Sequence, residues 1–206
     1  METTAPLLGE PLPVELMNTI WADREGVHDA LERPDDTRAW LHAVAPRVAL
    51  LAGHDLRDIP AKDTAELAVR LTGLRDALRR LAAEATGDPR PAAASATREL
   101  DAAVDALNEA AGAVPTWSAL TWTSGGAPAR HTRTRGHAAA ATVSAIAEEG
   151  IELFSRGTDT PLRACLAPGC VLYFIKDHPR REWCSPTCGS RARSARHYQR
   201  HRNTTH

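Results

Sequence analysis

The most regular apolar pattern of the chain lies in residues 64–85. Leucines recur there at alternating spacings of four and three, and the stripe consists of Leu67, Leu71, Leu74, Leu78 and Leu81. Positions spaced in this way fall on one face of an α-helix, so the pattern predicts a long helix that buries this face. Three arginines, Arg75, Arg79 and Arg80, fall off the stripe. We interpret them as a solvated side balanced by Asp76 and Glu84, rather than as a basic binding face.

Weaker patterns of the same kind predict further helices. One covers residues 15–22, and a second is capped by Asp35 or Asp36 and ends before Pro46. A third is capped by Ser95 and ends near Gly112, and a fourth runs from about Gly136 to Arg156. Small polar residues favour helix starts, and glycine and proline favour helix ends. Alanine is the commonest residue and aromatic residues make up 4% of the chain. The predicted fold class is therefore mainly α.

One segment, residues 114–135, departs from the helical pattern. Its first part, VPTWSALTW, is rich in residues that favour strands, and Ser124-Gly125-Gly126 favours a turn. The following ARHTRTR can return as a second strand. We predict a β-hairpin within the helical N-terminal domain.

Charge divides the chain into two unlike parts. The formal net charge of the 206 residues is −1. Residues 1–155 hold 15 Lys and Arg against 23 Asp and Glu, which gives −8, whereas residues 156–206 hold 10 against 3, which gives +7. An acidic body joined to a basic end points to a polyanion as the partner of that end.

The sequence argues against membrane residence and against catalysis. The longest uncharged stretch, residues 110–129, contains prolines and glycines and cannot supply the roughly 20 apolar residues of a spanning helix. The N-terminus has acids and prolines in place of a signal peptide, so we expect a cytoplasmic protein. Because the chain has no Gly-rich phosphate loop, GxSxG or HExxH motif, we do not expect an enzyme.

All four cysteines lie near the C-terminus, where Cys165, Cys170, Cys184 and Cys188 follow the spacing C-x4-C-x13-C-x3-C. Two close pairs suit a tetrahedral Zn²⁺, because each pair wraps one edge of the ion. The alternatives are two disulfides, a redox dithiol or an iron–sulfur cluster, and the absence of C-x2-C weakens the redox case. We favour structural zinc, because so short a segment rarely folds without a staple.

Local motifs around the cysteines predict how the site is built. Pro168-Gly169 favours a tight turn before Cys170, as in a zinc knuckle. Ser185 suits the cap and Pro186 the first position of a final helix, which brings Cys188 to the start of that helix. The prediction is a small treble-clef-like zinc finger that ends in a basic helix.

The final helix is expected to have an inner and an outer side. At about 100° per residue, Cys188, Ala192, Ala195 and Gln199 share one face, and arginines gather elsewhere. Arginine binds phosphates and can grip guanine through two hydrogen bonds. The expected contacts to double-stranded DNA are Lys176, Arg180, Arg181, Arg191, Arg193, Arg196 and Arg200. The alternatives are a merely soluble tail or one that docks on an acidic protein.

The C-terminal motifs resemble those of the CGNR zinc-finger proteins. The resemblance consists of C-x4-C, Phe174, Arg180-Arg181, Trp183-Cys184-Ser185 and Cys188-Gly189-Ser190-Arg191. In the family an asparagine stands where this chain has Ser190. Serine is small and can bond locally, so we expect metal binding to survive this difference.

The N-terminal part resembles the ABATE domain that precedes the CGNR finger in this family. The matching residues are Leu16, Asn18-Thr19, Asp29-Ala30-Leu31 and Trp40-Leu41. The resemblance implies a mainly α-helical body, a C-terminal zinc finger, and a role as a bacterial, stress-related transcription regulator.

These observations lead to a division at residues 1–157, the ABATE-like body, and 158–206, the finger. We expect a DNA-binding transcription regulator whose body senses a small-molecule effector or forms a homodimer. A protein- or RNA-interaction zinc module without sequence-specific DNA binding is the alternative. The residues considered for an effector pocket are Asn18, Arg24, His131 and His137.

Overall fold

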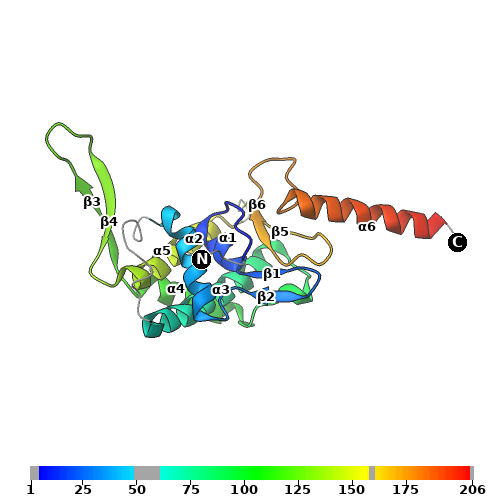
Figure 1. Ribbon diagram of the computed structural model, residues 1–206, viewed down its shortest axis with the longest axis horizontal. Helices are drawn as coiled ribbons and strands as arrows, with labels where there is room; N and C mark the ends of the chain where they lie inside the picture. Colours follow the sequence, from blue (N-terminus) through cyan, green and yellow to red (C-terminus); the bar gives the residue numbers. More distant parts are fainter. Residues whose placement is uncertain (1–4, 49–60, 158–160, 205–206) are drawn as a thin grey trace.

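Helices make up about half of the protein, which confirms the predicted mainly α fold class. The computed structural model describes residues 5–48, 61–157 and 161–204 (Figure 1). The helices are α1 (Leu12–Met17), α2 (Pro34–Val44), α3 (Ala61–Thr86), α4 (Leu100–Gly112), α5 (Ala138–Ser155) and α6 (Pro186–Thr204), with short 3-10 turns at Ala45–Arg47 and Pro91–Ala93. The strands are β1 (Ile20–Ala22), β2 (Val27–Asp29), β3 (Thr116–Thr121), β4 (Ala129–Thr134), β5 (Leu162–Ala164) and β6 (Tyr173–Ile175). They form three separate antiparallel pairs, β1–β2, β3–β4 and β5–β6.

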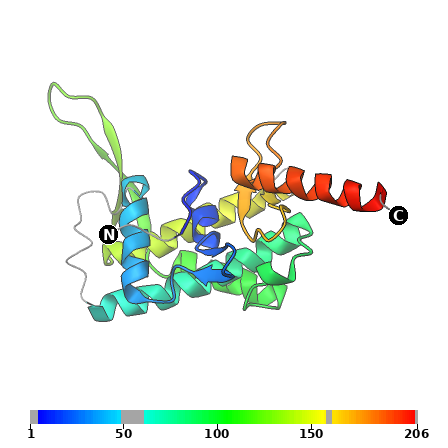
Figure 2. The same ribbon diagram turned by 45° about the vertical axis from the view of Figure 1, so that its right-hand side comes forward.

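Helix α3 is the centre of the body, as its leucine stripe predicts. It packs against α1, α2, α4 and α5, and all five leucines of the stripe are buried (Figures 1 and 2). Helix α5 comes close to it at Gly150, where a β-carbon would lie 2.8 Å from Cδ2 of Leu78. A side chain at this crossing would therefore displace the end of Leu78, so glycine suits the close packing of the two helices.

The prediction for the arginines of α3 is wrong for two of the three. Arg75 and Arg79 are only 3% and 1% exposed, respectively, while Arg80 lies nearer the surface and pairs with Glu84. Arg75 pairs with Asp29 of β2 and with Asp76, and Arg79 donates to backbone carbonyls. Because elements pack on several sides of α3, positions beside its leucine stripe are covered as well.

The predicted helix over residues 15–22 is also wrong, since α1 ends at Met17 and the chain turns into the β1–β2 hairpin. The hydroxyl of Thr19 donates to the carbonyl of Leu16 at 2.8 Å, which holds the chain at the end of the helix. In the hairpin, the rings of Trp21 and His28 stack with centroids 4.3 Å apart. The turn between the strands uses Gly26 at φ 139°, a conformation that favours glycine.

Two helix starts differ from the predictions as well. Helix α2 begins at Pro34, so Asp35 and Asp36 lie in its first turn instead of capping it. Helix α4 begins at Leu100, and the hydroxyl of Ser95 donates to the carbonyl of Asp76 at 2.6 Å. A tertiary contact to α3 thus takes the side chain that the local pattern assigns to a cap.

The predicted β-hairpin is confirmed as β3–β4, with Thr116 paired to Thr134 and Thr121 to Ala129. It projects from the body as a two-stranded ribbon in both views (Figures 1 and 2). Most of its residues are exposed. No helix within the described ranges is long and apolar enough to cross a membrane.

The finger, residues 161–204, packs on the body through its first two strands. Leu162 of β5 and Tyr173 of β6 are fully buried in the same core as α1 and α3. The cysteines belong to a second, smaller core with Phe174 and Ala192. The boundary expected between residues 157 and 158 lies beside residues 158–160, which are outside the described ranges.

Candidate metal centre and basic helix

The first cysteine pair lies on a knuckle that follows β5. The amide of Cys165 donates to the carbonyl of Leu172 at 2.9 Å, and the amide of Cys170 donates to Ala167 at 2.9 Å. Between them Gly169 has φ 72°, which completes the tight turn predicted from Pro168-Gly169. This turn brings both sulfurs to one side of the chain.

The second pair is fixed by the start of α6. The helix begins at Pro186, and the hydroxyl of Ser185 accepts a hydrogen bond from the amide of Cys188 at 3.2 Å. The predicted cap is therefore present. A β-carbon at Gly189 would lie 3.1 Å from Cδ1 of Trp183, so glycine allows this indole to pack closely on the first turn.

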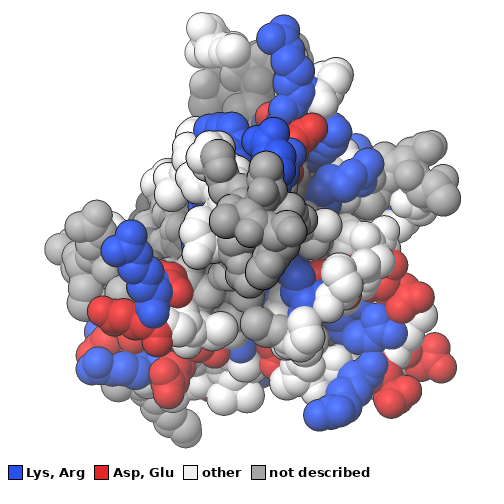
Figure 3. Space-filling model, turned by 90° about the vertical axis from the view of Figure 1, so that its right-hand side faces the viewer, with Lys and Arg blue, Asp and Glu red and all other residues white. Residues whose placement is uncertain are grey.

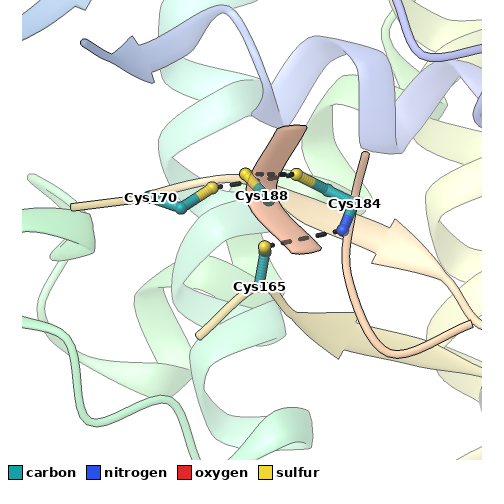
Figure 4. Close-up of side chains that lie close together, drawn as sticks. All are labelled: Cys165, Cys170, Cys184 and Cys188. Carbon is teal, nitrogen blue, oxygen red and sulfur yellow. Dashed lines mark hydrogen bonds between the residues drawn. The ribbon is translucent and has the colours of Figure 1, made fainter. Parts of the chain in front are cut away.

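The four sulfurs converge on one point (Figure 4). All four cysteines are buried, and their sulfurs lie within 4.8 Å of one another. The sulfur of Cys184 is 3.8 Å from that of Cys170 and 3.4 Å from that of Cys188. These separations are too long for disulfide bonds of about 2.05 Å. They fit the edges of a tetrahedron with metal–sulfur bonds of about 2.3 Å, which are about 3.8 Å long.

The closeness of the sulfurs also separates the pKa values of the thiols. Hydrogen bonds from Cys170 and Cys184 lower the pKa of Cys165 to about 2. The resulting thiolate raises the pKa of Cys170 to about 12 and also raises that of Cys184. Without a cation, these shifts favour the thiolate at Cys165 and the thiol at Cys170 and Cys184. A divalent cation at the centre would let the other thiols ionise as well.

A body arginine, Arg90, holds the backbone of the knuckle. One terminal nitrogen of its guanidinium donates to the carbonyls of Cys165 at 2.9 Å, Cys170 at 3.0 Å and Leu172 at 3.2 Å. Its other terminal nitrogen donates to a carboxylate oxygen of Asp88 at 2.6 Å. Arg90 thus orients the residues that carry two of the four sulfurs, without touching a sulfur itself.

Tyr173 completes this contact between body and finger. Its hydroxyl donates to Asp88 at 2.7 Å, and burial, followed by this hydrogen bond, raises the pKa of Tyr173 to about 12. The guanidiniums of Arg79 and Arg90 both lie over its ring, 5.3 Å and 5.1 Å from the centroid. Arg79 also donates to the carbonyls of Met17 and Ala93, each at 2.9 Å.

Two N-terminal side chains join the same junction. The amide of Asn18 pairs with the backbone of Tyr173 in both directions, at 3.0 Å and 2.9 Å. Glu10, which is buried, accepts from the amide of Ile175 at 2.9 Å and pairs with Arg181. We call Glu10, Asn18, Arg79, Asp88 and Arg90 the junction residues. The sequence patterns placed Asn18 in an effector pocket and Arg79 on a solvated helix face. They gave no sign of a role for the other three, because each of the five has a partner far along the chain.

The arginines expected to bind DNA fall into two groups. Arg181 pairs with Glu10 and donates to the carbonyl of Ile175 at 2.9 Å, while Arg191 donates to the sulfur of Cys188 at 3.0 Å. Both thus take part in building the finger. The exposed residues of the expected set are Arg180, Arg193, Arg196 and Arg200, and Lys176 is half-buried.

Helix α6 extends away from the rest of the molecule (Figures 1 and 2). Its inner face is buried at Cys188 and Ala192, half-buried at Ala195 and exposed at Gln199, so it leaves the finger after about two turns. The helix contains no Asp or Glu. Seen from the side to which α6 points, the charged side chains in the upper part of the molecule are mostly Lys and Arg, whereas acidic side chains lie mostly lower, mixed with basic ones (Figure 3).

The residues considered for an effector pocket lie on separate elements. Asn18 is buried at the junction, Arg24 is exposed in the turn between β1 and β2, His131 is exposed on β4, and His137 is exposed before α5. Asn18 therefore has a structural partner, and the other three residues face solvent.

The fold and the site define a class of protein: a helical body that carries a C-terminal four-cysteine zinc finger. A family model named ABATE, described as "Putative stress-induced transcription regulator", matches residues 10–157, and the CGNR zinc finger model matches residues 162–201. The chain belongs to the ABATE family, which confirms the resemblance seen in its motifs. No curated protein matches it in sequence. The family asparagine is replaced by Ser190, whose hydroxyl accepts a hydrogen bond from Arg193 at 3.0 Å.

Proposed function

We propose that the protein is a transcription regulator that binds double-stranded DNA through α6. The observation that carries the proposal is the union of two features in one helix. Cys188 in its first turn belongs to the four-cysteine cluster, and its second half projects with exposed arginines and no acidic side chain. A helix anchored at one end and basic at the other can enter the major groove without first having to fold.

The metal in this proposal is Zn²⁺, held by Cys165, Cys170, Cys184 and Cys188. The sulfur separations suit a tetrahedral ion, and four thiolates leave no open position for a substrate. Its role is structural: it ties the knuckle to the start of α6. The proposal is accordingly one of binding rather than catalysis.

Arg193 and Arg196 are the leading candidates for DNA contacts. Neither forms an ion pair with a described carboxylate. Arg196 is exposed, although its guanidinium also lies over the ring of Trp183 in the finger, 5.8 Å from the ring centroid. Arg180 and Arg200 extend the same basic surface. The acidic body has the remaining roles, namely binding a small effector or pairing two copies of the chain.

The test is DNA binding by the zinc-loaded full chain across a series of salt concentrations. The double variant Arg193→Gln/Arg196→Gln should bind roughly 10- to 100-fold more weakly. Its slope of log K against log salt should be less steep by about 2, since each lost phosphate contact contributes about 0.9.

The matched control is Arg70→Gln/Arg156→Gln, which removes two exposed positive charges from the body, each paired with a glutamate. It should bind as the unchanged protein does. Equal binding by both double variants would contradict the proposal. Retention of an acidic protein or a transcript, with no enriched duplex in a selection from random DNA, would favour the interaction-module alternative.

A further inference from the structure

The projecting hairpin β3–β4 has a basic face that the function proposed for α6 does not use. Strand residues alternate between two faces, so His131 and Arg133 lie on the same side, beside their cross-strand partners Ala119 and Trp117. Arg135 continues this alternation, and its guanidinium lies 6.0 Å from the ring centroid of Trp117. One face of the ribbon thus presents two arginines, a histidine and an indole.

The arginines of the hairpin are not balanced by carboxylates. No Asp or Glu occurs from Ala110 to Ala147. Among the ion pairs of the described ranges, none includes Arg130, Arg133 or Arg135, whereas Arg70, Arg75, Arg80 and Arg156 of the body each have an acidic partner. In this respect the hairpin resembles α6 and differs from the body to which it is attached.

The exposed apolar side chains of the hairpin lie mainly on the face opposite Arg133. Trp117, 44% exposed, lies on the face of Arg133. Leu120, 69% exposed, lies on the other face, and Trp122, 68% exposed, follows it two positions later, just beyond the end of β3. On the face of Leu120, Arg130 donates to the hydroxyl of Ser118 at 2.9 Å. The face of Trp117, His131 and Arg133 therefore offers a single indole among basic side chains, rather than the contiguous apolar area that a protein partner usually covers.

We propose that β3–β4 is a second nucleic-acid arm, which binds duplex DNA through the face formed by Trp117, His131, Arg133 and Arg135. A two-stranded ribbon has the width to enter the major groove, where arginine reaches both phosphates and guanine. The exposed indole adds a flat surface that can contact the sugar and base edges. The proposed contact is independent of the metal centre, which lies on a different element.

The experiment compares Arg133→Gln/Arg135→Gln with Arg70→Gln/Arg156→Gln in the zinc-loaded full chain, with a labelled duplex of mixed sequence as the probe. The hairpin variant should bind about tenfold more weakly or worse, with a salt slope less steep by about 2, while the control is unchanged. Trp117→Ala should weaken binding without changing the salt slope. Far-ultraviolet circular dichroism and the melting temperature should stay as in the unchanged protein, because all these side chains are exposed.

The α6 variant Arg193→Gln/Arg196→Gln is measured alongside to separate the two proposals. If it weakens binding and the hairpin variant does not, the hairpin proposal falls and the function of α6 stands. If only the hairpin variant weakens binding, the hairpin proposal stands and the DNA-binding function proposed for α6 falls. Unchanged DNA binding by the hairpin variant, together with a loss of dimer in light scattering, would overturn the proposal in favour of a contact with a second copy of the chain.

Discussion

The arginines at the junction and those on α6 lie in opposite surroundings. Arg79 and Arg90 are surrounded by carbonyls, Asp88 and the ring of Tyr173, whereas Arg193 and Arg196 are exposed on a helix without acids. The first pair contributes to holding the finger on the body, and we propose that the second pair contributes to binding DNA. The comparison teaches that the positive charge of a sequence does not by itself mark a binding surface.

The largest expected effect is loss of the proposed metal centre, which in our proposal anchors α6. Cys184→Ser leaves three thiolates and should reduce the zinc content from one ion per chain to nearly none, since structural zinc contributes on the order of 10 kcal/mol to such folds. The contribution of α6 to DNA binding should be lost with it. Metal analysis and fluorescence anisotropy measure both quantities.

The matched control for this change is Thr187→Ala, which alters an exposed residue between the two cysteines of the second pair. It should retain zinc and DNA binding. Full zinc content and normal DNA binding in the Cys184→Ser protein would mean that α6 is not anchored by the metal.

Breaking the junction should come next in magnitude. Arg79→Met keeps the length of the side chain but removes the donors to the carbonyls of Met17 and Ala93. Leaving buried carbonyls without partners should lower the free energy of unfolding by about 2–4 kcal/mol. The midpoint of urea unfolding measures this loss, and an unchanged midpoint would show that Arg79 does not stabilise the body.

Arg90→Met tests whether the junction supports zinc binding by the knuckle. Because Arg90 orients the carbonyls beside Cys165 and Cys170, its loss should weaken zinc binding about 10- to 100-fold, as expected for a residue that supports ligands. Competition with a chelator of known affinity measures it. Zinc affinity equal to that of the unchanged protein would contradict the supporting role.

The contribution of Asp88 to the junction makes the stability of the protein depend on pH. Burial works against the charge of Asp88, but hydrogen bonds from Arg90 and Tyr173 outweigh it, and the pKa of Asp88 is lowered from its usual 3.8. The carboxylate therefore stabilises the folded state above about pH 4. This contribution is lost as the pH falls from 3.8 through the lowered value, because the unfolded chain takes up the proton first.

Asp88→Asn isolates this contribution. The variant should be less stable than the unchanged protein by about 2 kcal/mol at pH 7, and the difference should shrink below pH 4. Urea unfolding at several pH values measures it. A difference that stays constant down to pH 3 would assign the loss to packing rather than to the ionised carboxylate.

The smallest expected effect on stability is that of the α6 arginines. Arg193→Gln/Arg196→Gln should change the free energy of unfolding by less than about 0.5 kcal/mol, since both side chains are exposed. Thermal unfolding measures it. A large loss of stability would show that these arginines are structural, like those of the junction, and would contradict the difference between the two groups.

Features that depend on residues close together in the sequence could be predicted, whereas features that depend on distant residues could not. The metal centre depends on turns and a helix start within 24 residues, Cys165 to Cys188, so spacing and local motifs were sufficient. The leucine stripe of α3 and the turn of β3–β4 are local in the same way. The CGNR and ABATE motifs then pointed to the family.

The junction could not be predicted by such reasoning. Asn18 bonds to Tyr173 over 155 positions, and Arg181 pairs with Glu10 over 171. No periodicity links residues so distant, and a buried arginine such as Arg79 looks like a surface residue when only its own helix is considered. The β1–β2 hairpin was missed because Leu16, Ile20 and Trp21 also suit a helical face.

The most direct test of the contrast between the two groups of arginines is NMR of their side-chain Nε–H signals during titration of the zinc-loaded protein with duplex DNA. The expected result is that the signals of Arg193 and Arg196 shift or broaden, while those of Arg79 and Arg90 stay in place. The contradictory result is that DNA moves the signals of Arg79 and Arg90 and leaves those of α6 unchanged.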